Sequence, residues 1–451
     1  MEETPIPFGP EGLKGRVVVV GSGPAGMFAA LELARAGYRP LLLERGKPVP
    51  ERDGDISTFF KGGELNTESN VQFGEGGAGT YSDGKLTTRI KDGRCQRVFG
   101  TLVKKGAPEE ILYSHKPHIG TDVLKSVVVN LRNEIISLGG EVCFGAKMTD
   151  LILSHEKVVG ILLEDGRRFE TGAMILAIGH SSRDTYEMLY RRGVAMEQKA
   201  FAIGLRVEHR QSMLNEGQYG RYADHKKLGA ADYSLAMRSS RTGRSAYSFC
   251  MCPGGYVVAA TSEKDQVVVN GMSEFRRDGD NANSALVVNV NPQDFGEHLL
   301  DGIEFQRHWE RMAFRQGGGN YHAPVEGIGS FLGGGGLGGA SVLTRPTYVP
   351  GVKNARLEEC IPRYVALTLQ EGILDFGRKI RGFSDGSGIL TGVETRTSAP
   401  VRIVRKKDCQ SVNVGNLYPC GEGAGYAGGI VSAAVDGIRC AQAIMERFKP
   451  F

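Results

Sequence analysis

Six residues near the start of the chain have the types and spacing needed to hold the phosphates of a dinucleotide. They read Gly-Ser-Gly-Pro-Ala-Gly at 21–26 and directly follow the apolar run 16–20. Gly21 permits a tight turn, Gly23 lets a pyrophosphate approach the backbone, and Gly26 lets a helix pack closely on the preceding strand. The phosphates would then meet free N–H groups at the start of that helix. The string therefore predicts a dinucleotide-binding fingerprint.

An acidic residue follows at the position where a ribose would need it. Glu44 ends the apolar run 41–43, about 20 residues after the fingerprint, the spacing at which a carboxylate reaches a ribose hydroxyl. Strand, glycine turn, helix, strand and acid thus occur in the order that a mononucleotide-binding unit requires.

The elements that must position these residues belong to an α/β fold. Residues 121–138 have helical periodicity and end at Gly139, and strands are expected at 141–144, 150–154, 158–163 and 168–170. The fully apolar run 173–178 stops at Gly179, as a buried parallel strand does beside a ligand crevice. We predict a Rossmann-like domain with a central parallel sheet and a β-meander.

A second domain is expected between two parts of the first. From 181 to 392 the sequence changes to mixed strands, short helices and glycine-rich loops, and 416–420, 421–429 and 430–448 then read as strand, loop and amphipathic helix. We predict a discontinuous nucleotide domain at 1–180 and 393–451, with an inserted α+β substrate or capping domain at 181–392. The glycine-rich run 333–339 is interpreted as a loop of this insertion, because no apolar strand precedes it and Pro346 prevents a following helix.

Composition excludes several classes of function. The formal net charge of +4 over 451 residues is too small to indicate a nucleic-acid partner. No apolar run approaches the length of a membrane-spanning helix, and no signal peptide is recognised. The eight cysteines are scattered, so reduced thiols and a cytoplasmic location are expected. Oligomeric state is not predicted.

Two sites outside the glycine strings are candidates for catalysis. His118 precedes the predicted helix at 121 and could donate a proton, or it could be a loop histidine bonded to backbone. Cys250 and Cys252 share one face of a strand and could form a redox pair or act as nucleophiles, or they could be ordinary reduced thiols beside a turn. His180 and His322 are weaker candidates. Arg396 and Arg402 could bind a carboxylate or the phosphates of a cofactor, or they could be structural. No metal site is predicted, because no histidine, cysteine and carboxylate spacing resembles one.

The cofactor that fits the whole pattern best is FAD. A second glycine-rich segment at 74–79 and a third at 421–429 exceed what NAD requires. The arrangement resembles the FAD superfamily that includes glutathione reductase and aromatic hydroxylases. Within it, the strings 71–86, 116–122, 248–255, 394–402 and 418–429 resemble a group of bacterial NAD(P)/FAD-dependent dehydrogenases.

This resemblance implies roles for residues in each glycine-rich segment. Glu44 would hold the adenosine ribose, the segment 76–80 with Ser82 would line the flavin, and Gly179 would turn the chain beside FAD. Glu422 stands where the superfamily usually has an aspartate. The helix that starts near Gly429 would stabilise negative charge on reduced flavin. The complete predicted cofactor site is Gly21, Ser22, Gly23, Pro24, Ala25, Gly26, Glu44, Arg45, Gly46, Gly76, Gly77, Ala78, Gly79, Thr80, Ser82, Met148, Gly179, Gly421, Glu422, Gly429, Ile430 and Val431.

The leading hypothesis is an FAD-dependent oxidoreductase that transfers a hydride between flavin and a small organic substrate. NAD(P)H is a candidate donor, but a second complete fingerprint is missing, so it would bind transiently or be replaced by another electron-transfer partner. A flavoprotein monooxygenase is the alternative enzyme. One observation argues against it, because the Asp-Gly motif of the hydroxylases is replaced here by Ile178-Gly179. A flavin-containing, tRNA-modifying protein is the alternative of another class, and the small net charge opposes it.

Overall fold

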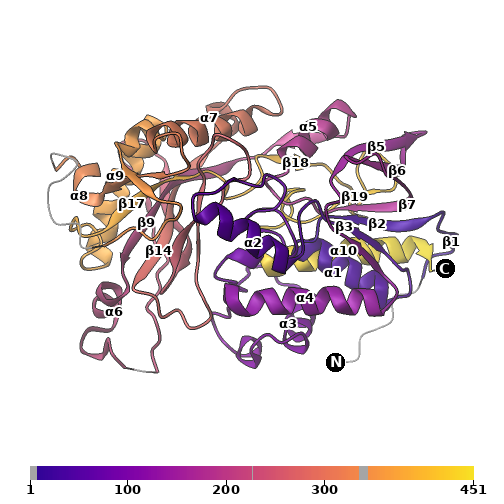
Figure 1. Ribbon diagram of the computed structural model, residues 1–451, viewed down its shortest axis with the longest axis horizontal. Helices are drawn as coiled ribbons and strands as arrows, with labels where there is room; N and C mark the ends of the chain where they lie inside the picture. Colours follow the sequence, from indigo (N-terminus) through magenta and orange to yellow (C-terminus); the bar gives the residue numbers. More distant parts are fainter. Residues whose placement is uncertain (1–7, 226, 335–343, 451) are drawn as a thin grey trace.

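Two seven-stranded sheets organise the chain, and the computed structural model describes residues 8–225, 227–334 and 344–450 (Figure 1). The first sheet has the strand order β4-β3-β2-β7-β6-β5, with β19 beside β7. Its parallel strands are β2 (Arg16–Val20), β3 (Leu41–Leu43), β4 (Glu141–Cys143), β7 (Arg168–Leu176) and β19 (Leu417–Pro419), and the antiparallel meander adds β5 (Met148–Ser154) and β6 (Lys157–Leu163). This confirms the predicted Rossmann-like fold.

Helices cover the first sheet because their apolar faces match its buried strands. The four are α1 (Pro24–Arg35), α3 (Arg94–Lys104), α4 (Thr121–Ser137) and α10 (Ile430–Arg447). Val17 and Val19 share one core with the buried faces of α1 and α10. At Gly437 a Cβ atom would collide with the carbonyl oxygen of Ala25. The glycine therefore lets α10 lie directly against α1, beside the fingerprint.

Strand β7 differs from the sequence-based expectation of two separate strands at 168–170 and 173–178. It is one strand that pairs antiparallel with β6 and then parallel with β2. Its register with β2 shifts between Thr171 and Ala173, and a Cβ at Gly172 would collide with the carbonyl oxygen of Lys14. A bulge at a glycine thus lets one strand belong to both the meander and the parallel sheet.

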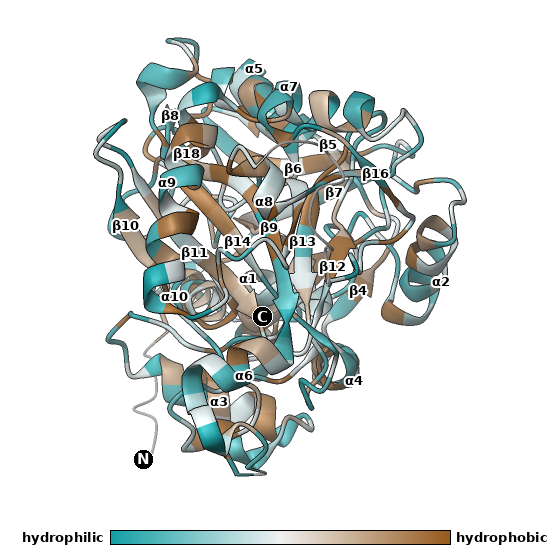
Figure 2. Ribbon diagram, turned by 90° about the vertical axis from the view of Figure 1, so that its left-hand side faces the viewer, coloured by the Kyte–Doolittle hydropathy of each residue, from teal (hydrophilic) through white to brown (hydrophobic). Residues whose placement is uncertain are grey.

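The second sheet is mainly antiparallel and has the order β10-β11-β14-β9-β17-β15-β16. Its strands are β9 (Phe201–Arg210), β10 (Ala236–Arg238), β11 (Ser245–Cys252), β14 (Asn281–Val290), β15 (Ala323–Gly327), β16 (Val352–Asn354) and β17 (Ile389–Glu394). Helices α6 (Gln211–Tyr219), α7 (Asp301–Gln316), α8 (Ile328–Phe331) and α9 (Arg363–Lys379) accompany it. Hydrophobic strands such as β14 form the interior, and more hydrophilic helices such as α7 lie outside them (Figure 2). Two of these helices are longer than the short helices expected here.

The segment between the sheets belongs structurally with the first one. Helix α5 (Arg183–Arg191) packs on β5, and β8 (Met196–Gln198) pairs with β18 (Val401–Ile403). Tyr186, Leu189 and Val401 join the core beneath the meander. The second sheet therefore starts at Phe201 and ends at Glu394. Its start lies 20 residues after the predicted boundary at 181, and its end lies two residues after the predicted boundary at 392.

The remaining elements are short or lie in loops. They are β1 (Glu11–Gly12), β12 (Tyr256–Ala259), β13 (Val269–Met272), β20 (Phe448–Lys449), α2 (Val49–Phe60) and the single turns Ala78–Tyr81, Glu109–Leu112, Gly220–Tyr222, Pro292–Asp294 and Leu357–Glu359. Most of the predicted loop 333–339 lies outside the described residues. In the described part of the chain, none of the helices is long and apolar enough to cross a membrane.

Candidate functional site

A single cavity of about 410 Å³ extends from the fingerprint to the edge of the second sheet. Most residues predicted to hold the cofactor line it. They are Gly21, Gly23, Pro24, Ala25, Glu44, Arg45, Gly77, Ala78, Gly79, Ser82, Met148, Gly179, Glu422, Gly429 and Ile430, together with the catalytic candidate Cys250. The carboxyl ends of parallel strands and a second domain enclose the space, as in other open α/β sheets.

The fingerprint has the geometry that close approach of a ligand requires. Gly21 has φ +99°, and a Cβ there would collide with the carbonyl oxygen of Ala177. A Cβ at Gly26 would collide with the carbonyl oxygen of Gly21, so this glycine lets α1 pack on β2. At Gly23 the nearest atom to a Cβ would be the Cα of Gly77 at 4.0 Å. Gly23 therefore leaves open space on the cavity wall, which a pyrophosphate fits.

Glu44 is buried beneath the fingerprint and ties three loops together. Its Oε2 accepts hydrogen bonds from the N–H (2.9 Å) and the hydroxyl (2.7 Å) of Ser22. Its Oε1 accepts hydrogen bonds from the N–H groups of Gly46 (2.9 Å) and Gly74 (3.0 Å). A carboxylate offers about four acceptor positions, so protein donors occupy this one fully. A ribose hydroxyl could therefore bind Glu44 only if the Ser22 hydroxyl gave up its hydrogen bond to this carboxylate.

The glycine-rich loop 70–77 is held by an arginine that the sequence did not single out. Arg52 of α2 is fully buried. Its guanidinium donates to the carbonyl oxygens of Asn70 (2.8 Å), Glu75 (2.7 Å), Val71 (3.0 Å) and Gly77 (3.0 Å). The loop has no sheet or helix to satisfy these carbonyls, so Arg52 fixes its shape.

Some predicted residues support the wall without lining it. Ser22, Gly26, Gly46, Gly76, Thr80, Gly421 and Val431 are outside the set of lining residues, as are His118 and Cys252. Cys252 lies buried behind Cys250. Among the described residues, the wall also includes Gln72, Lys85, Asn270, Glu394 and Thr397, which the sequence did not single out as site residues.

His118 lies away from the cavity wall and holds two segments together. Its Nε2 is 2.9 Å from the carbonyl oxygen of Phe275, and its ring stacks on that of Phe275 at 5.4 Å between centroids. Burial, and then the positive charge of Arg277, lowers the pKa of His118. This geometry matches the loop-histidine alternative rather than an acid beside the ligand.

The cavity wall also includes residues of the loop 421–429 and the start of α10, close to the fingerprint, because an added Cβ at Gly79 would lie 3.3 Å from Ile430 and 3.8 Å from Pro24. Gly429 precedes the helix with no side-chain cap, and neither Gly428 nor Gly429 has an atom within 4 Å of an added Cβ. The first N–H groups of α10 therefore remain available to an anion in the cavity. Tyr186 fixes this loop to the turn after β7, because its hydroxyl lies 2.7 Å from the carbonyl oxygen of Gly423 and 3.0 Å from that of Gly179.

Two carboxyl groups on the cavity wall have pKa values shifted toward neutrality. Burial raises the pKa of Glu422 to about 7, although Lys199 opposes the shift. Burial also raises the pKa of Glu394 to about 7, and Arg206 opposes it with a hydrogen bond of 2.9 Å. Titratable groups perturbed in this way within one cavity are typical of an active site.

His180 is held neutral on the same wall. Its Nδ1 is 2.9 Å from the hydroxyl oxygen of Ser181. Burial, followed by the charge of Arg396, lowers the pKa of His180 to about 3. At neutral pH this imidazole is uncharged, so it can donate one hydrogen bond and accept another but carries no positive charge.

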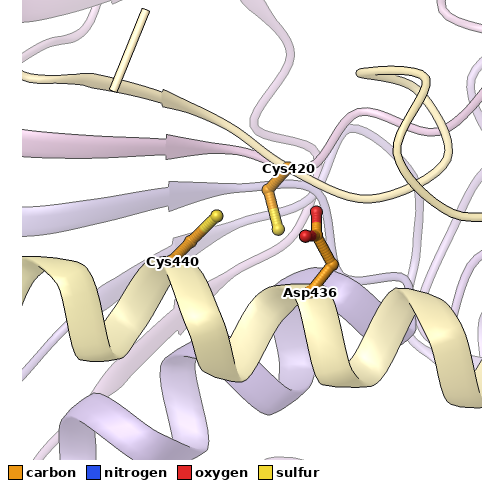
Figure 3. Close-up of side chains that lie close together, drawn as sticks. All are labelled: Cys420, Asp436 and Cys440. Atoms are coloured by element: carbon orange, nitrogen blue, oxygen red, sulfur yellow. The ribbon is translucent and has the colours of Figure 1, made fainter. Parts of the chain in front are cut away.

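A buried group of two thiols and a carboxylate lies behind the loop 421–429. The side chains of Cys420, Asp436 and Cys440 point toward one another from the loop and α10 (Figure 3), and their ligand atoms lie within 4.8 Å. Arg405 already neutralises this group: it pairs with both oxygens of Asp436 (2.6 and 2.9 Å) and lies 3.5 Å from the sulfur of Cys440. Asp436 also accepts the N–H of Gly421 at 2.8 Å. The geometry is that of an anchor for the loop.

Two family descriptions divide the chain between them. Residues 15–188 match the family described as pyridine nucleotide-disulphide oxidoreductase. Residues 200–397 match the family described as FAD-dependent protein, C-terminal domain-like. The second match covers the same strands as the second sheet.

Full-length similarity is found to a protein of Clostridium beijerinckii that is described as uncharacterized. It is 55% identical over 449 residues, which are 98% of this chain and 83% of that protein. Among solved structures, CtdE in complex with FAD has a TM-score of 0.34 at 15% identity and covers 94% of this chain and 82% of its own. Glycine oxidase from Bacillus cereus has a TM-score of 0.40 at 11% identity and covers 96% and 97%. The assignment therefore depends on the sequence matches.

Proposed function

The chain belongs to the same family as the Clostridium beijerinckii protein, a family of FAD-dependent oxidoreductases, and from this premise we propose how the cavity divides. The AMP half of FAD would lie against the fingerprint and Glu44. The flavin ring would lie between the start of α10 and the wall that contains Cys250, Glu394 and Glu422. A small organic substrate would exchange a hydride with the flavin there.

The observation that carries this proposal is the continuity of the cavity. Its wall contains the fingerprint, an uncapped helix start and two carboxyl groups of raised pKa. The glycines of these segments leave open space where side chains would otherwise stand. A long cofactor with phosphates in the middle and a reactive ring at one end fits a cavity with these features.

Bound FAD would supply the hydride chemistry, and the chain's own residues would supply position and protons. The first N–H groups of α10 would stabilise negative charge on the ring. Glu394 and Glu422 would accept or return the proton that leaves the substrate with the hydride, since a group with a pKa near the working pH does this best. The second sheet would keep water away from the reacting atoms.

We further propose NAD(P)H as a transient electron donor. The proposal is tested with purified holoprotein mixed anaerobically with NADH or NADPH while the visible absorbance of oxidised flavin is followed. Rapid loss of absorbance with one of the two donors is the expected result. Photochemical reduction of the same sample serves as the control that the bound flavin can be reduced. A flavin that is reduced by light but by neither nucleotide refutes this donor.

The fate of the oxygen atoms of O₂ separates the oxidoreductase from the monooxygenase alternative. With substrate present, a monooxygenase inserts an oxygen atom from O₂ into the product, whereas a dehydrogenase removes hydrogen only. Isotope-labelled O₂ with mass analysis of the product distinguishes these results. We expect no label in the product, and incorporation of label would replace our proposal by the monooxygenase.

A further inference from the structure

Strand β11 contains a bulge at the point where it reaches the cavity. Phe249 pairs with Ala285 and Cys252 pairs with Asn283 on β14, so two residues of β11 stand opposite one residue of its partner. The first of the two, Cys250, has φ +45°. A cysteine in the left-handed region is strained, because its Cβ crowds the backbone. Strain held at a ligand cavity points to a role for the residue that bears it.

The two thiols of this segment differ in access but lie together. Cys250 is half-buried on the cavity wall, whereas Cys252 is fully buried. The Cys252 thiol donates to the carbonyl oxygen of Cys250 over 3.3 Å. Residues two apart in an extended strand have Cα atoms about 6.6 Å apart, and disulfides bridge separations up to about 6.8 Å. The spacing of the two residues therefore falls within the range that a disulfide can bridge.

A buried arginine fixes the bulge and places positive charge beside the Cys252 thiol. Arg206 donates to the carbonyl oxygen of Cys250 at 2.6 Å and lies 3.5 Å from the sulfur of Cys252. It is fully buried and paired with Glu394 at 2.9 Å. A Cβ at Gly271 would collide with its guanidinium, so that glycine makes room for it.

This environment separates the two thiols chemically. A hydrogen bond between the two side chains, followed by the charges of Lys85 and Arg206, lowers the pKa of the Cys250 thiol despite its burial. The same side-chain hydrogen bond, followed by burial, raises the pKa of Cys252. Cys250 is therefore the more readily ionised of the two thiols. A thiolate is the reactive form of cysteine.

The other six cysteines lack this combination. Cys95, Cys360, Cys409, Cys420 and Cys440 are buried. Cys143 is half-buried like Cys250, but burial and the nearby charge of Glu141 raise its pKa. Cys143 is thus a matched control: a half-buried thiol whose pKa is raised and not lowered.

We propose that Cys250 and Cys252 form an oxidisable dithiol that reacts with hydrogen peroxide. The Cys250 thiolate attacks one peroxide oxygen, the O–O bond breaks and hydroxide leaves, which makes Cys250 a sulfenic acid. The Cys252 thiol then attacks the sulfenic sulfur, an S–S bond forms and water leaves. Together the two sulfurs give up two electrons, and one peroxide becomes one water and one hydroxide, which takes a proton from solvent to give the second water. The reaction needs no cofactor, so it goes beyond the proposed function and is tested separately from it.

The test follows each thiol by mass spectrometry in the folded, purified holoprotein. The protein is reduced, freed of reductant and exposed to hydrogen peroxide for increasing times. Free thiols are then blocked with one alkylating reagent, and disulfides are reduced and labelled with a second. We expect Cys250 and Cys252 to acquire the second label together, at least about tenfold faster than Cys143 is oxidised.

Three variants separate the two steps. In C252S a dimedone-type reagent should trap sulfenic acid on Cys250, because no resolving thiol remains. In C250S, Cys252 should stay reduced, and C143S should behave as the wild type. Oxidation of Cys250 no faster than that of Cys143, or an unchanged oxidation of Cys252 in C250S, would overturn the proposal.

Discussion

At the scale of single residues, the site is built by side chains that satisfy loop backbone. Glu44 receives four donors from three loops, and Arg52 supplies donors to four carbonyl oxygens of the loop 70–77. Each replaces hydrogen bonds that a strand or helix would otherwise make. The loops can therefore be open enough to line a cavity and still have one defined shape.

Arg52→Lys should disorder the loop while retaining the charge. An ammonium group has three donors on one atom and cannot reach four carbonyl oxygens spread along a loop. We expect the free energy of unfolding to fall by about 3 kcal/mol and the affinity for FAD to fall at least about tenfold. Urea unfolding and fluorescence titration with FAD measure the two effects. Arg89→Lys, at an exposed arginine, is the control, and equal effects in both variants would contradict the role of Arg52.

Glu422→Gln should remove a pH dependence from the apoprotein. Burial raises the pKa of Glu422 from 4.5 to about 7, so the folded state binds this proton more tightly than the unfolded state. The stabilisation is complete below about 4.5 and is lost as the pH rises through about 7. Relative to the variant, the wild type should lose about 1–3 kcal/mol across this window.

Melting temperatures of wild-type and variant apoprotein across this pH range measure the effect. Glu197→Gln, at an exposed acid, is the control and should follow the wild type. A difference between wild type and Glu422→Gln that does not change with pH would contradict the assignment.

At the scale of elements, the loop 421–429 depends on α10 for its position. Asp436 accepts the Gly421 N–H and pairs with Arg405, so one carboxylate joins the loop, the helix and the segment before β19. The sequence predicted the loop and the helix, because glycine content and helical period are local signals. It could not predict this anchor, because Arg405 and Asp436 meet only in the folded chain.

Strand β7 shows the same limit of local signals. The apolar run at 173–178 and the polar run at 168–170 differ in composition, so they were predicted as two strands. The bulge at Gly172 joins them, and the need for it arises from packing against Lys14.

Asp436→Asn should destabilise the protein and loosen the loop. Removing the charge leaves the buried guanidinium of Arg405 without its partner, at a cost of about 3–5 kcal/mol. Cys440→Ala should cost less, and a metal chelator should leave the melting temperature of the wild type unchanged, because Arg405 and not a cation neutralises Asp436. Differential scanning calorimetry measures all three. A lower melting temperature with chelator would show instead that the thiols and Asp436 hold a metal.

At the scale of the whole molecule, a buried ion network joins the two sheets. Glu310 of α7 pairs with Arg183 of α5 at 2.7 Å and with Arg396, beyond β17, at 2.9 Å. It also accepts the hydroxyl of Thr395 at 2.6 Å. Burial opposes ionisation of Glu310, but the two arginines outweigh it and lower the pKa of this carboxyl. Arg396 of this network lines the cavity, as does His180.

Glu310→Gln should uncouple the sheets. Two buried guanidinium groups would lose the counter-charge between them and keep only Glu263, which pairs with Arg183 and lies 3.7 Å from Arg396, at a cost of about 3 kcal/mol. Because the pKa of Glu310 is lowered on folding, its stabilisation is present at neutral pH and is lost as the pH falls toward that pKa. Calorimetry at neutral pH should show a lower melting temperature. Glu304→Gln on the same helix, at an exposed acid, should change it little, and equal shifts would contradict the network.

The domain boundaries at 181 and 392 stay a prediction, and the second sheet runs from Phe201 to Glu394. The strand, loop and helix expected after 416 followed from glycine and apolar periods. The start of the second sheet near 200 did not, because Tyr186 and Leu189 resemble any amphipathic helix until the meander core is known. Arg206, Glu394 and Asn270 likewise meet only through three different strands.

The central claim is that the cavity holds FAD with its phosphates at Gly23, and FAD binding to apoprotein tests it most directly. Binding is titrated for the wild type, Gly23→Ala and Gly100→Ala, with melting temperature measured on the same apoprotein samples. A Cβ meets no atom closer than 4.0 Å at Gly23 and none within 4 Å at Gly100, so both variants should fold. We predict wild-type affinity in Gly100→Ala and a loss of at least about tenfold in Gly23→Ala, because its methyl group occupies the pyrophosphate position. Wild-type protein that binds no FAD, or a folded Gly23→Ala that binds it as tightly as the wild type, would contradict the account.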